Sequence, residues 1–481
     1  MSRSSPVKLS YSPVFALVLL LATGIVSGQQ DAVGLSNESL QRLSDFQRQL
    51  EAMETRFGPF DERLLAVLLS IEGELAAQGR DEEVIASQGR RLQILRMAVG
   101  LESLTLLPVL EDSLDTRMRL GDWDEAADLL AHMRYLQTLN FGENSEAVFA
   151  AMEREATLHL ARVAVGDRQS RADNFMDARD LYEDMLDIAE ERFGEQDPRL
   201  IPSLYRRAFT LYVLVKLLNT ESGMAGETID ELMERDGSAR LTTFRRPGVF
   251  DPNSVFGPGP GSRIPVVEGD EPVGLAYLRQ ALGYVDDIRD IAEAIDDQEM
   301  LAMATLYHGD FQLLMGRGSG RGDYRDALEL LRAAGIAEER LTDLFAKPMV
   351  IPVETFFTRF DGLENYQQQL MAAAGPEADG DSGLGVFLAW HDDLRAVRMP
   401  SGIASLMGAN ESTSEVLLEF TVNSRGQVTS VDTLSAQPDE ARVRRQAVRA
   451  LREVRFRPRF IDGSPSSLRD ATMIYRSPLE E

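Results

Sequence analysis

The stretch Gly121-Asp122-Trp123-Asp124-Glu125-Ala126 decides the fold, because it returns along the chain. It recurs as Gly322-Asp323-Tyr324-Arg325-Asp326-Ala327, and in weaker form as Asp173-Asn174-Phe175-Met176-Asp177-Ala178. Each copy has an aromatic residue followed three positions later by alanine. The pattern predicts a tight turn, an aromatic wedge, and a helix whose alanine allows close approach of a neighbour.

A second marker repeats between these copies. It consists of an apolar residue and a glycine, Phe57-Gly58, Val99-Gly100, Phe141-Gly142 and Phe193-Gly194, at spacings of 42, 42 and 52 residues. Trp123 and Phe175 are also 52 residues apart, so one insertion accounts for both long intervals. A helical hairpin of this size cannot bury its own apolar face, and we therefore expect neighbouring hairpins to stack into an α-solenoid.

These residues resemble the long variety of the tetratricopeptide (TPR) superfamily, over residues 40–218 and about 300–345. We expect TPR-like helical repeats at 40–235 and further TPR-like helices at 273–345. The first unit departs from the pattern, with Asp81 in place of the aromatic wedge and Val84 in place of alanine, which suggests a capping hairpin. An irregular helical bundle with chance glycine spacing is the alternative.

Two segments interrupt the helical pattern. Residues 236–272 contain six prolines and the run GPGPG at Gly257 to Gly261, and a long Pro/Gly-rich loop is expected there. Residues 346–411 include Pro348 and Pro352 and the run AAAGPEADGDSGLG after Met371, which predict an extended segment and a linker.

The N-terminus has the features of an export signal. Arg3 and Lys8 precede an apolar run from Val14 to Val26, and small residues precede Gln29. A bilayer span needs about 20 apolar residues, so residues 1–28 are expected to be a cleaved signal peptide. This places the protein in the periplasm. The alternative is an uncleaved anchor on the periplasmic side of the inner membrane.

Composition excludes several classes of protein. The 481 residues include 78 Asp+Glu, 50 Lys+Arg and no Cys, and the formal net charge is −28. This average surface repels nucleic acid, and the lack of cysteine excludes zinc fingers, thiol nucleophiles and disulfide frameworks. The acidic excess is uneven, since from Glu411 onward eleven Arg match eleven Asp+Glu.

After Ser412 the hydrophobic period changes from helical to strand-like. Glu415 to Val422 alternates and is followed by a turn at Asn423 to Gly426 and a second strand to Leu434, which predicts a β-hairpin. A helix is expected to open at Pro438, a third strand at 454–460, and a further strand at 472–475. The expected fold class is therefore mainly α, with an α-solenoid followed by a small α+β domain of ββαβ order at 412–481.

The set EVLLEFTV from Glu415, Gly426-Gln427-Val428, Leu434-Ser435-Ala436-Gln437-Pro438 and Val454-Arg455-Phe456-Arg457-Pro458 resembles the C-terminal domain of the TonB energy-transducer family. The resemblance implies a periplasmic domain that binds envelope proteins, in TonB itself outer-membrane transporters. An edge of a three-stranded sheet can accept a strand from such a partner. This chain departs from the family, because helical repeats replace the Pro-rich stretch and the N-terminal segment looks cleavable.

No constellation in the sequence points to catalysis, a metal or a cofactor. The four histidines, His132, His159, His308 and His391, lack metal-ligand spacing, and acidic pairs such as Asp286-Asp287 are expected on solvated helix faces. We therefore expect a non-enzymatic protein with no cofactor.

A dense basic cluster is the candidate partner-binding site. Its residues are Arg442, Arg444, Arg445, Arg449 and Arg452, with Phe456 on the strand that follows. It would suit an acidic partner peptide, peptidoglycan or lipopolysaccharide. The alternative is a solvated helix face balanced by Glu440 and Glu453. The oligomeric state cannot be read from the sequence.

Overall fold

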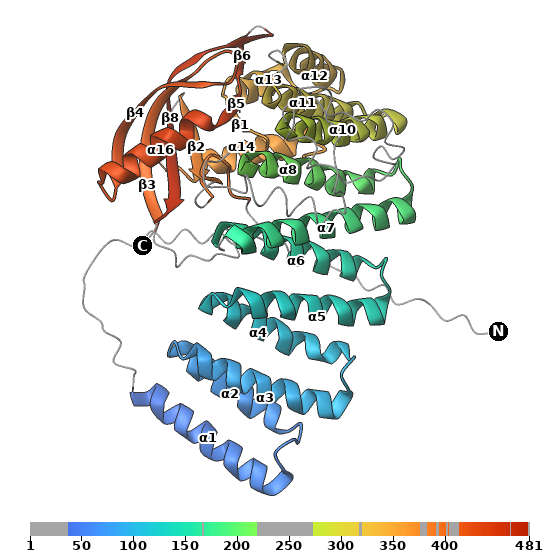
Figure 1. Cartoon of the computed structure of the whole chain (residues 1–481), viewed down its shortest axis with the longest axis vertical. Coiled ribbons are helices and arrows are strands. Elements are labelled where there is room, and N and C mark those ends of the chain that lie inside the picture. The colour runs from blue at the N-terminus through green and yellow to red at the C-terminus, as the bar shows by residue number, and fades with distance from the viewer. Residues whose placement is uncertain are drawn as a thin grey trace, which may run out of the picture.

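The computed structural model describes residues 37–165, 168–218, 273–316, 320–375, 382–390, 394–400, 403, 413–461 and 463–479. The fold of this part is mainly helical, with a small sheet region towards the C-terminus, as the sequence predicts (Figure 1). The expected signal peptide at 1–28 and Pro/Gly-rich loop at 236–272 lie outside the described residues. None of the described helices has the length and hydrophobicity needed to cross a membrane.

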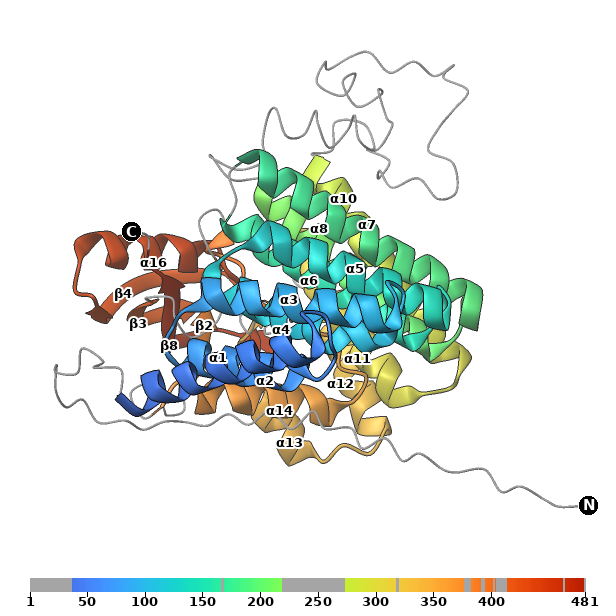
Figure 2. The same ribbon diagram turned by 90° about the horizontal axis from the view of Figure 1, so that it is seen from below.

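The helices before the sheet region follow one another along the chain, with short connections except between α8 and α10, where residues 219–272 lie outside the described part. They are α1 (Asn37–Phe57), α2 (Leu64–Ala77), α3 (Asp81–Val99), α4 (Leu107–Leu120), α5 (Trp123–Phe141), α6 (Glu146–Val165), α7 (Arg168–Phe193), α8 (Ile201–Leu218), α10 (Val273–Ala294), α11 (Gln298–Leu314) and α12 (Arg321–Ala333). From α1 to α12 each of these helices packs against the next one along the chain. Figures 1 and 2 show the first eight stacked in chain order.

The aromatic–alanine marker has a packing role in every copy. Ala126, Ala178 and Ala327 are each fully buried. Phe175 and Tyr324 are also fully buried, whereas Trp123 is half-buried. The turn is less regular than expected, because α7 begins at Arg168, so Asp173 and Asn174 lie within the helix.

The glycines of the second marker lie in connections between successive helices, directly after α1, α3, α5 and α7. Two of these connections, at Gly58 and Gly194, share the sequence Phe-Gly-x-x-Asp-x-Arg and the same contacts. The guanidinium of Arg63 lies 3.7 Å from the centre of the Phe57 ring, and that of Arg199 lies 3.7 Å from the Phe193 ring. The shared contacts identify these two connections as equivalent.

The C-terminal part contains a four-stranded sheet with one helix across it. Its elements are α13 (Glu338–Phe345), β1 (Met349–Ile351), α14 (Phe360–Ala372), β2 (Gly383–Leu388), β3 (Thr413–Val422), β4 (Val428–Gln437), α16 (Ala441–Glu453), β5 (Arg455–Arg457), β6 (Arg459–Ile461), β7 (Ser464–Ser466) and β8 (Leu468–Pro478). The strand order is β2-β8-β3-β4, with β2 parallel to β8 and the other neighbours antiparallel.

The hairpin and the helix were predicted more accurately than the strands after them. The alternation in β3 buries Val416, Leu418, Phe420 and Val422 on the face that α16 covers. Helix α16 begins at Ala441, three residues after the start expected at Pro438. The third strand predicted at 454–460 is divided into β5 and β6, which pair with β1 and β7 and not with the main sheet. The further strand predicted at 472–475 lies within the longer β8, which pairs with β3 in the main sheet.

The extended segment and linker expected within residues 346–411 contain more regular structure than predicted. The extended part includes β1, α14 follows it, and the residues from Gly383 at the end of the expected linker form β2, which fills the outer edge of β8. Residues 376–381 of the expected linker lie outside the described part. Gly385 makes this possible, because a Cβ there would lie 2.4 Å from the carbonyl oxygen of Leu370 in α14. An open edge at β8 is therefore ruled out. Among the described strands of the main sheet, β4 is the other edge.

The sheet region is built onto the helices. Phe460 of β6 packs edge-on against Tyr324 of α12 and Phe345 of α13 and belongs to the main helical core. The side chain of Arg457 in β5 bonds to Asp310 in α11. These contacts fasten the small strand pairs β1–β5 and β6–β7, which lie next to the four-stranded sheet in the chain, to the helices.

Candidate partner-binding site

Helix α16 divides cleanly into a buried face and an arginine face. Val443, Ala447, Ala450 and Leu451 recur at helical spacing and are buried against the sheet. Burial of Val443 and Leu451 stabilises the fold by roughly 1.5–3 kcal/mol each. The arginines occupy the positions between them, so the packing that holds the helix turns the cationic side chains outward.

The structure brings four of the predicted site residues together in one groove. Arg444, Arg445, Arg449 and Arg452 line an open groove of about 690 Å³ with Thr433 of β4, Val448 and Glu453. Arg442 is exposed on the same helix, one turn towards its start. The half-buried Val448 provides an apolar surface between cationic walls.

Two arginines of the groove have acidic partners on the same chain. Arg444 forms an ion pair of 2.6 Å with Asp439, and Arg449 lies 3.9 Å from Glu453. Within the described residues, neither Arg445 nor Arg452 forms an ion pair. Guanidinium groups bind carboxylates and phosphates through paired hydrogen bonds, so the groove has the chemistry to hold an anionic group.

The C-terminal end of α16 also contacts the helical region. The ammonium group of Lys216 in α8 donates a hydrogen bond of 3.3 Å to the carbonyl oxygen of Glu453. Burial lowers the pKa of Lys216, and Glu453 opposes this effect. Helix α16, which carries the arginines, therefore contacts the helical region as well as the sheet.

Phe456 was wrongly assigned to the binding surface. Its side chain has no exposed area and packs against Phe420 inside the sheet core, with the ring centres 5.7 Å apart. The alternation that predicted a strand correctly marks it as an inward-facing position. A partner at the surface cannot contact it.

Arg457 has a role that the sequence did not reveal. Its side chain is only 4% exposed and forms a two-fold hydrogen bond with Asp310. Burial would lower the pKa of Arg457, but the charge of Asp310 raises it, so the guanidinium stays protonated. No local sequence signal links these residues, because 147 positions separate them.

Two histidines hold equivalent helix pairs together. Nδ1 of His159 lies 2.9 Å from Oδ1 of Asn174, and Nδ1 of His308 lies 2.9 Å from Oδ1 of Asp323. Both pairs are fifteen residues apart and join successive helices. Burial lowers the pKa of His132, and His391 is outside the described residues. The two bonded histidines act as packing residues.

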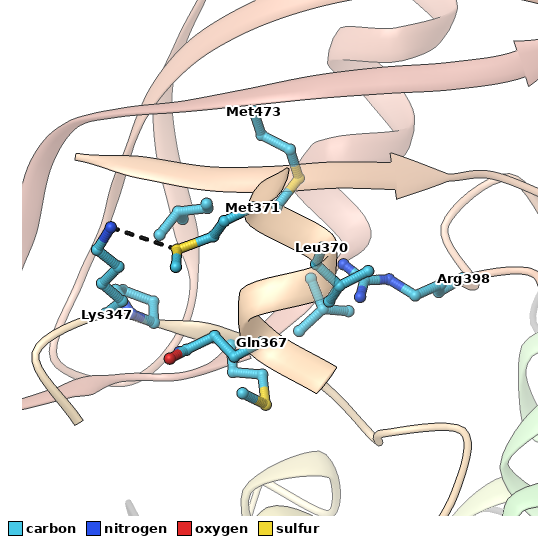
Figure 3. A pocket seen from close by; sticks show the side chains of 10 residues that line it. Lys347, Gln367, Leu370, Met371, Arg398 and Met473 are labelled. Atoms are coloured by element: carbon cyan, nitrogen blue, oxygen red, sulfur yellow. Dashed lines mark hydrogen bonds between the residues drawn. The ribbon is translucent and has the colours of Figure 1, made fainter. Parts of the chain in front are cut away.

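A small cavity lies where α14 meets β1 and β2 (Figure 3). It has a volume of about 10 Å³, and Lys347, Gln367, Leu370, Met371, Arg398 and Met473 are among its lining residues. A cavity of this size holds about one water molecule at most. Within the described part of the chain, no group of three or more His, Asp or Glu side chains could hold a metal ion.

No protein-family model and no curated protein matches the chain. Among solved structures, the crystal structure of BtubC (BKLC) from P. vanneervenii is similar over 62% of this chain and 93% of that chain, with 13% sequence identity and a TM-score of 0.26. A similarity at this level carries no argument about family or function.

Proposed function

We propose that this chain is a non-enzymatic protein-interaction protein of the periplasm, with a TPR-like α-solenoid and a TonB-type C-terminal domain. The observation that carries the proposal is the arginine groove on α16, a cationic surface on a helix that packs against the four-stranded sheet. Its partners are acidic surfaces of envelope proteins. The expected link to TonB-dependent transport across the outer membrane rests on the sequence resemblance alone.

The solenoid part of the proposal has support from packing. Each repeat helix contacts its neighbour along the chain, the marker alanines are all buried, and two equivalent glycine connections share one set of contacts. Repeat proteins with these features use extended surfaces to bind other proteins.

The position of β2 changes which surface is proposed for docking. In the sequence interpretation, a partner strand could join an edge of the sheet. Because β2 of the same chain already pairs with β8, strand addition there would require its displacement. The edge at β4 is still open, but we propose docking through the side chains of α16, because the arginine groove beside β4 supplies the positive charge that an acidic partner needs.

The test is crosslinking of the full-length chain in its native envelope. The double variant Arg445→Glu/Arg452→Glu reverses the groove charge at two exposed positions, and we expect it to lose the captured envelope proteins. The control is Arg48→Glu/Arg325→Glu, which changes the net charge equally at side chains that are 68% and 62% exposed. Equal capture by both variants would refute docking at α16.

Two alternatives make different predictions. An envelope scaffold that binds the cell wall without energy coupling would sediment with purified peptidoglycan and lose this binding on reversal of Arg444 and Arg445. A membrane-anchored energy transducer would keep residues upstream of Gln29 in the mature protein. N-terminal sequencing of the envelope fraction distinguishes the second alternative from a cleaved periplasmic protein.

A further inference from the structure

An acidic band on the chain itself is complementary in charge to the arginine groove. It consists of Asp187 and Glu190 of α7, Glu195 just after that helix, and Asp287 and Asp290 of α10. Asp187, Glu195, Asp287 and Asp290 are exposed, and Glu190 is half-buried. The two surfaces therefore carry opposite charges.

The carboxylates of the band lie close enough to repel one another. Burial raises the pKa of Glu190, and so do the charges of Asp187, Glu195 and Asp287. Burial also raises the pKa of Asp287, with Asp290 and Asp286 adding to the effect. Like charges this close destabilise each other, so a cationic surface placed over the band relieves their repulsion.

One copy of the chain cannot bring the two surfaces together. Figure 1 places α16 on the left of the molecule, across the sheet, and α10 and most of α7 on its right, and Figure 2 shows the same separation. The strands that follow α16 are fixed to the helices through Arg457 and Phe460, and the end of α16 contacts α8 through Lys216. The complement is therefore available only from another molecule.

We propose that the arginine groove of one copy docks against the α7–α10 acidic band of a second copy, so that the chain self-associates head to tail. This inference rests on the proposed function, because it uses the same docking groove, and it names one acidic partner. The contact joins two different surfaces, so each copy keeps one groove or one band available for the next copy.

Salt concentration sets the conditions for such a contact. The net charge of −28 makes copies repel at long range. At about 0.15 M ionic strength charges are screened beyond about 8 Å, so the local pairing of groove and band determines association. We expect concentration-dependent association at that ionic strength and its loss at about 1 M, where the screening length falls to about 3 Å.

The test is sedimentation of the full-length chain with two charge-reversal variants. Arg445→Glu/Arg452→Glu makes the groove acidic, and Asp187→Lys/Asp287→Lys makes the band basic. Each variant alone then presents two surfaces of like charge, and its self-association should weaken by at least about tenfold. In an equal mixture every groove again meets a band of opposite charge, so association should return.

Arg48→Glu/Arg325→Glu is the control, since it matches the net-charge change of the groove variant away from both surfaces, and it should associate like the unmodified chain. A chain that stays monomeric at about 0.15 M salt, or a mixture that does not recover, overturns the inference. Neither result affects docking of another envelope protein, because the crosslinking comparison measures that separately.

Discussion

Nη2 of Arg457 lies 2.5 Å from Oδ2 of Asp310, across the junction between strand β5 and helix α11. The side chains are 4% and 0% exposed. The hydroxyl group of Tyr324 donates a further hydrogen bond of 2.9 Å to the same carboxylate. A buried charge pair therefore joins two parts of the chain that the sequence pattern assigns to separate units.

Asp310→Ala should destabilise the whole described core. Removing one partner leaves the buried guanidinium without a counter-charge, which costs about 3–5 kcal/mol of unfolding free energy. Urea unfolding, followed by signals from both the helices and the sheet, should show both shifting to lower urea together. A loss confined to the sheet signal would contradict the continuous core.

A double variant separates the charge effect from simple loss of packing. Asp310→Leu/Arg457→Met replaces both charges with apolar groups, and such replacements are often close to neutral. We expect this variant to be more stable than Asp310→Ala. If it is equally unstable, the ion pair is not the reason for the loss.

Gly426 and Gly463 provide a second comparison, because both have left-handed backbones but different surroundings. Their φ angles are 71° and 70°. A Cβ at Gly426 would lie 1.8 Å from the carbonyl oxygen of Phe456, whereas nothing lies within 4 Å of one at Gly463. Gly463→Ala should cost only the backbone strain, roughly 1–2 kcal/mol.

Gly426→Ala should cost clearly more than Gly463→Ala, because the turn must also move away from β5. Thermal unfolding of the two single variants measures the difference. Similar melting temperatures for the two would mean that the hairpin turn is not packed against Phe456.

Local patterns predicted the helices, the hairpin and the inner face of α16, because their apolar periods span only a few turns. They could not predict the pairing of β2 with β8, since the short run at Gly383 to Leu388 is buried almost throughout and has no alternation. The role of Arg457 was hidden for a similar reason. From sequence alone, an arginine in a strand is expected to face solvent, because its buried partner, here Asp310, lies far away in the chain.

Burial of the marker alanines predicts that a larger side chain at these positions lowers the free energy of unfolding. Ala327 is fully buried in α12, and a leucine there should cost about 1–3 kcal/mol through overpacking. Ala333 is exposed in the same helix, so Ala333→Leu should change the unfolding free energy by no more than about 0.5 kcal/mol. Urea midpoints measure both, and equal effects would contradict close helix packing at the marker.

The side-chain contacts in the connection at Gly194 predict an unusually low pKa for Asp197. Asp197 accepts hydrogen bonds from the side chain and the backbone N–H of Arg199, and these bonds lower its pKa from 3.8 to about 2. Because the pKa is lower in the folded state, the stabilisation is present above pH 3.8 and is lost as the pH falls through about 2. Carbon NMR titration of the aspartate carboxyls measures this pKa directly.

Arg199→Gln should bring the pKa of Asp197 back towards its usual value, because the charged donor is lost. The equivalent connection supplies the matched control: Arg63→Gln should raise the lowered pKa of Asp61 and leave that of Asp197 unchanged. Both pairs also share the cation–ring contact, so agreement between them would show that the repeat preserves a complete loop, including its side-chain contacts. An Asp197 carboxyl that titrates near 3.8 with Arg199 intact would contradict the contacts of this connection.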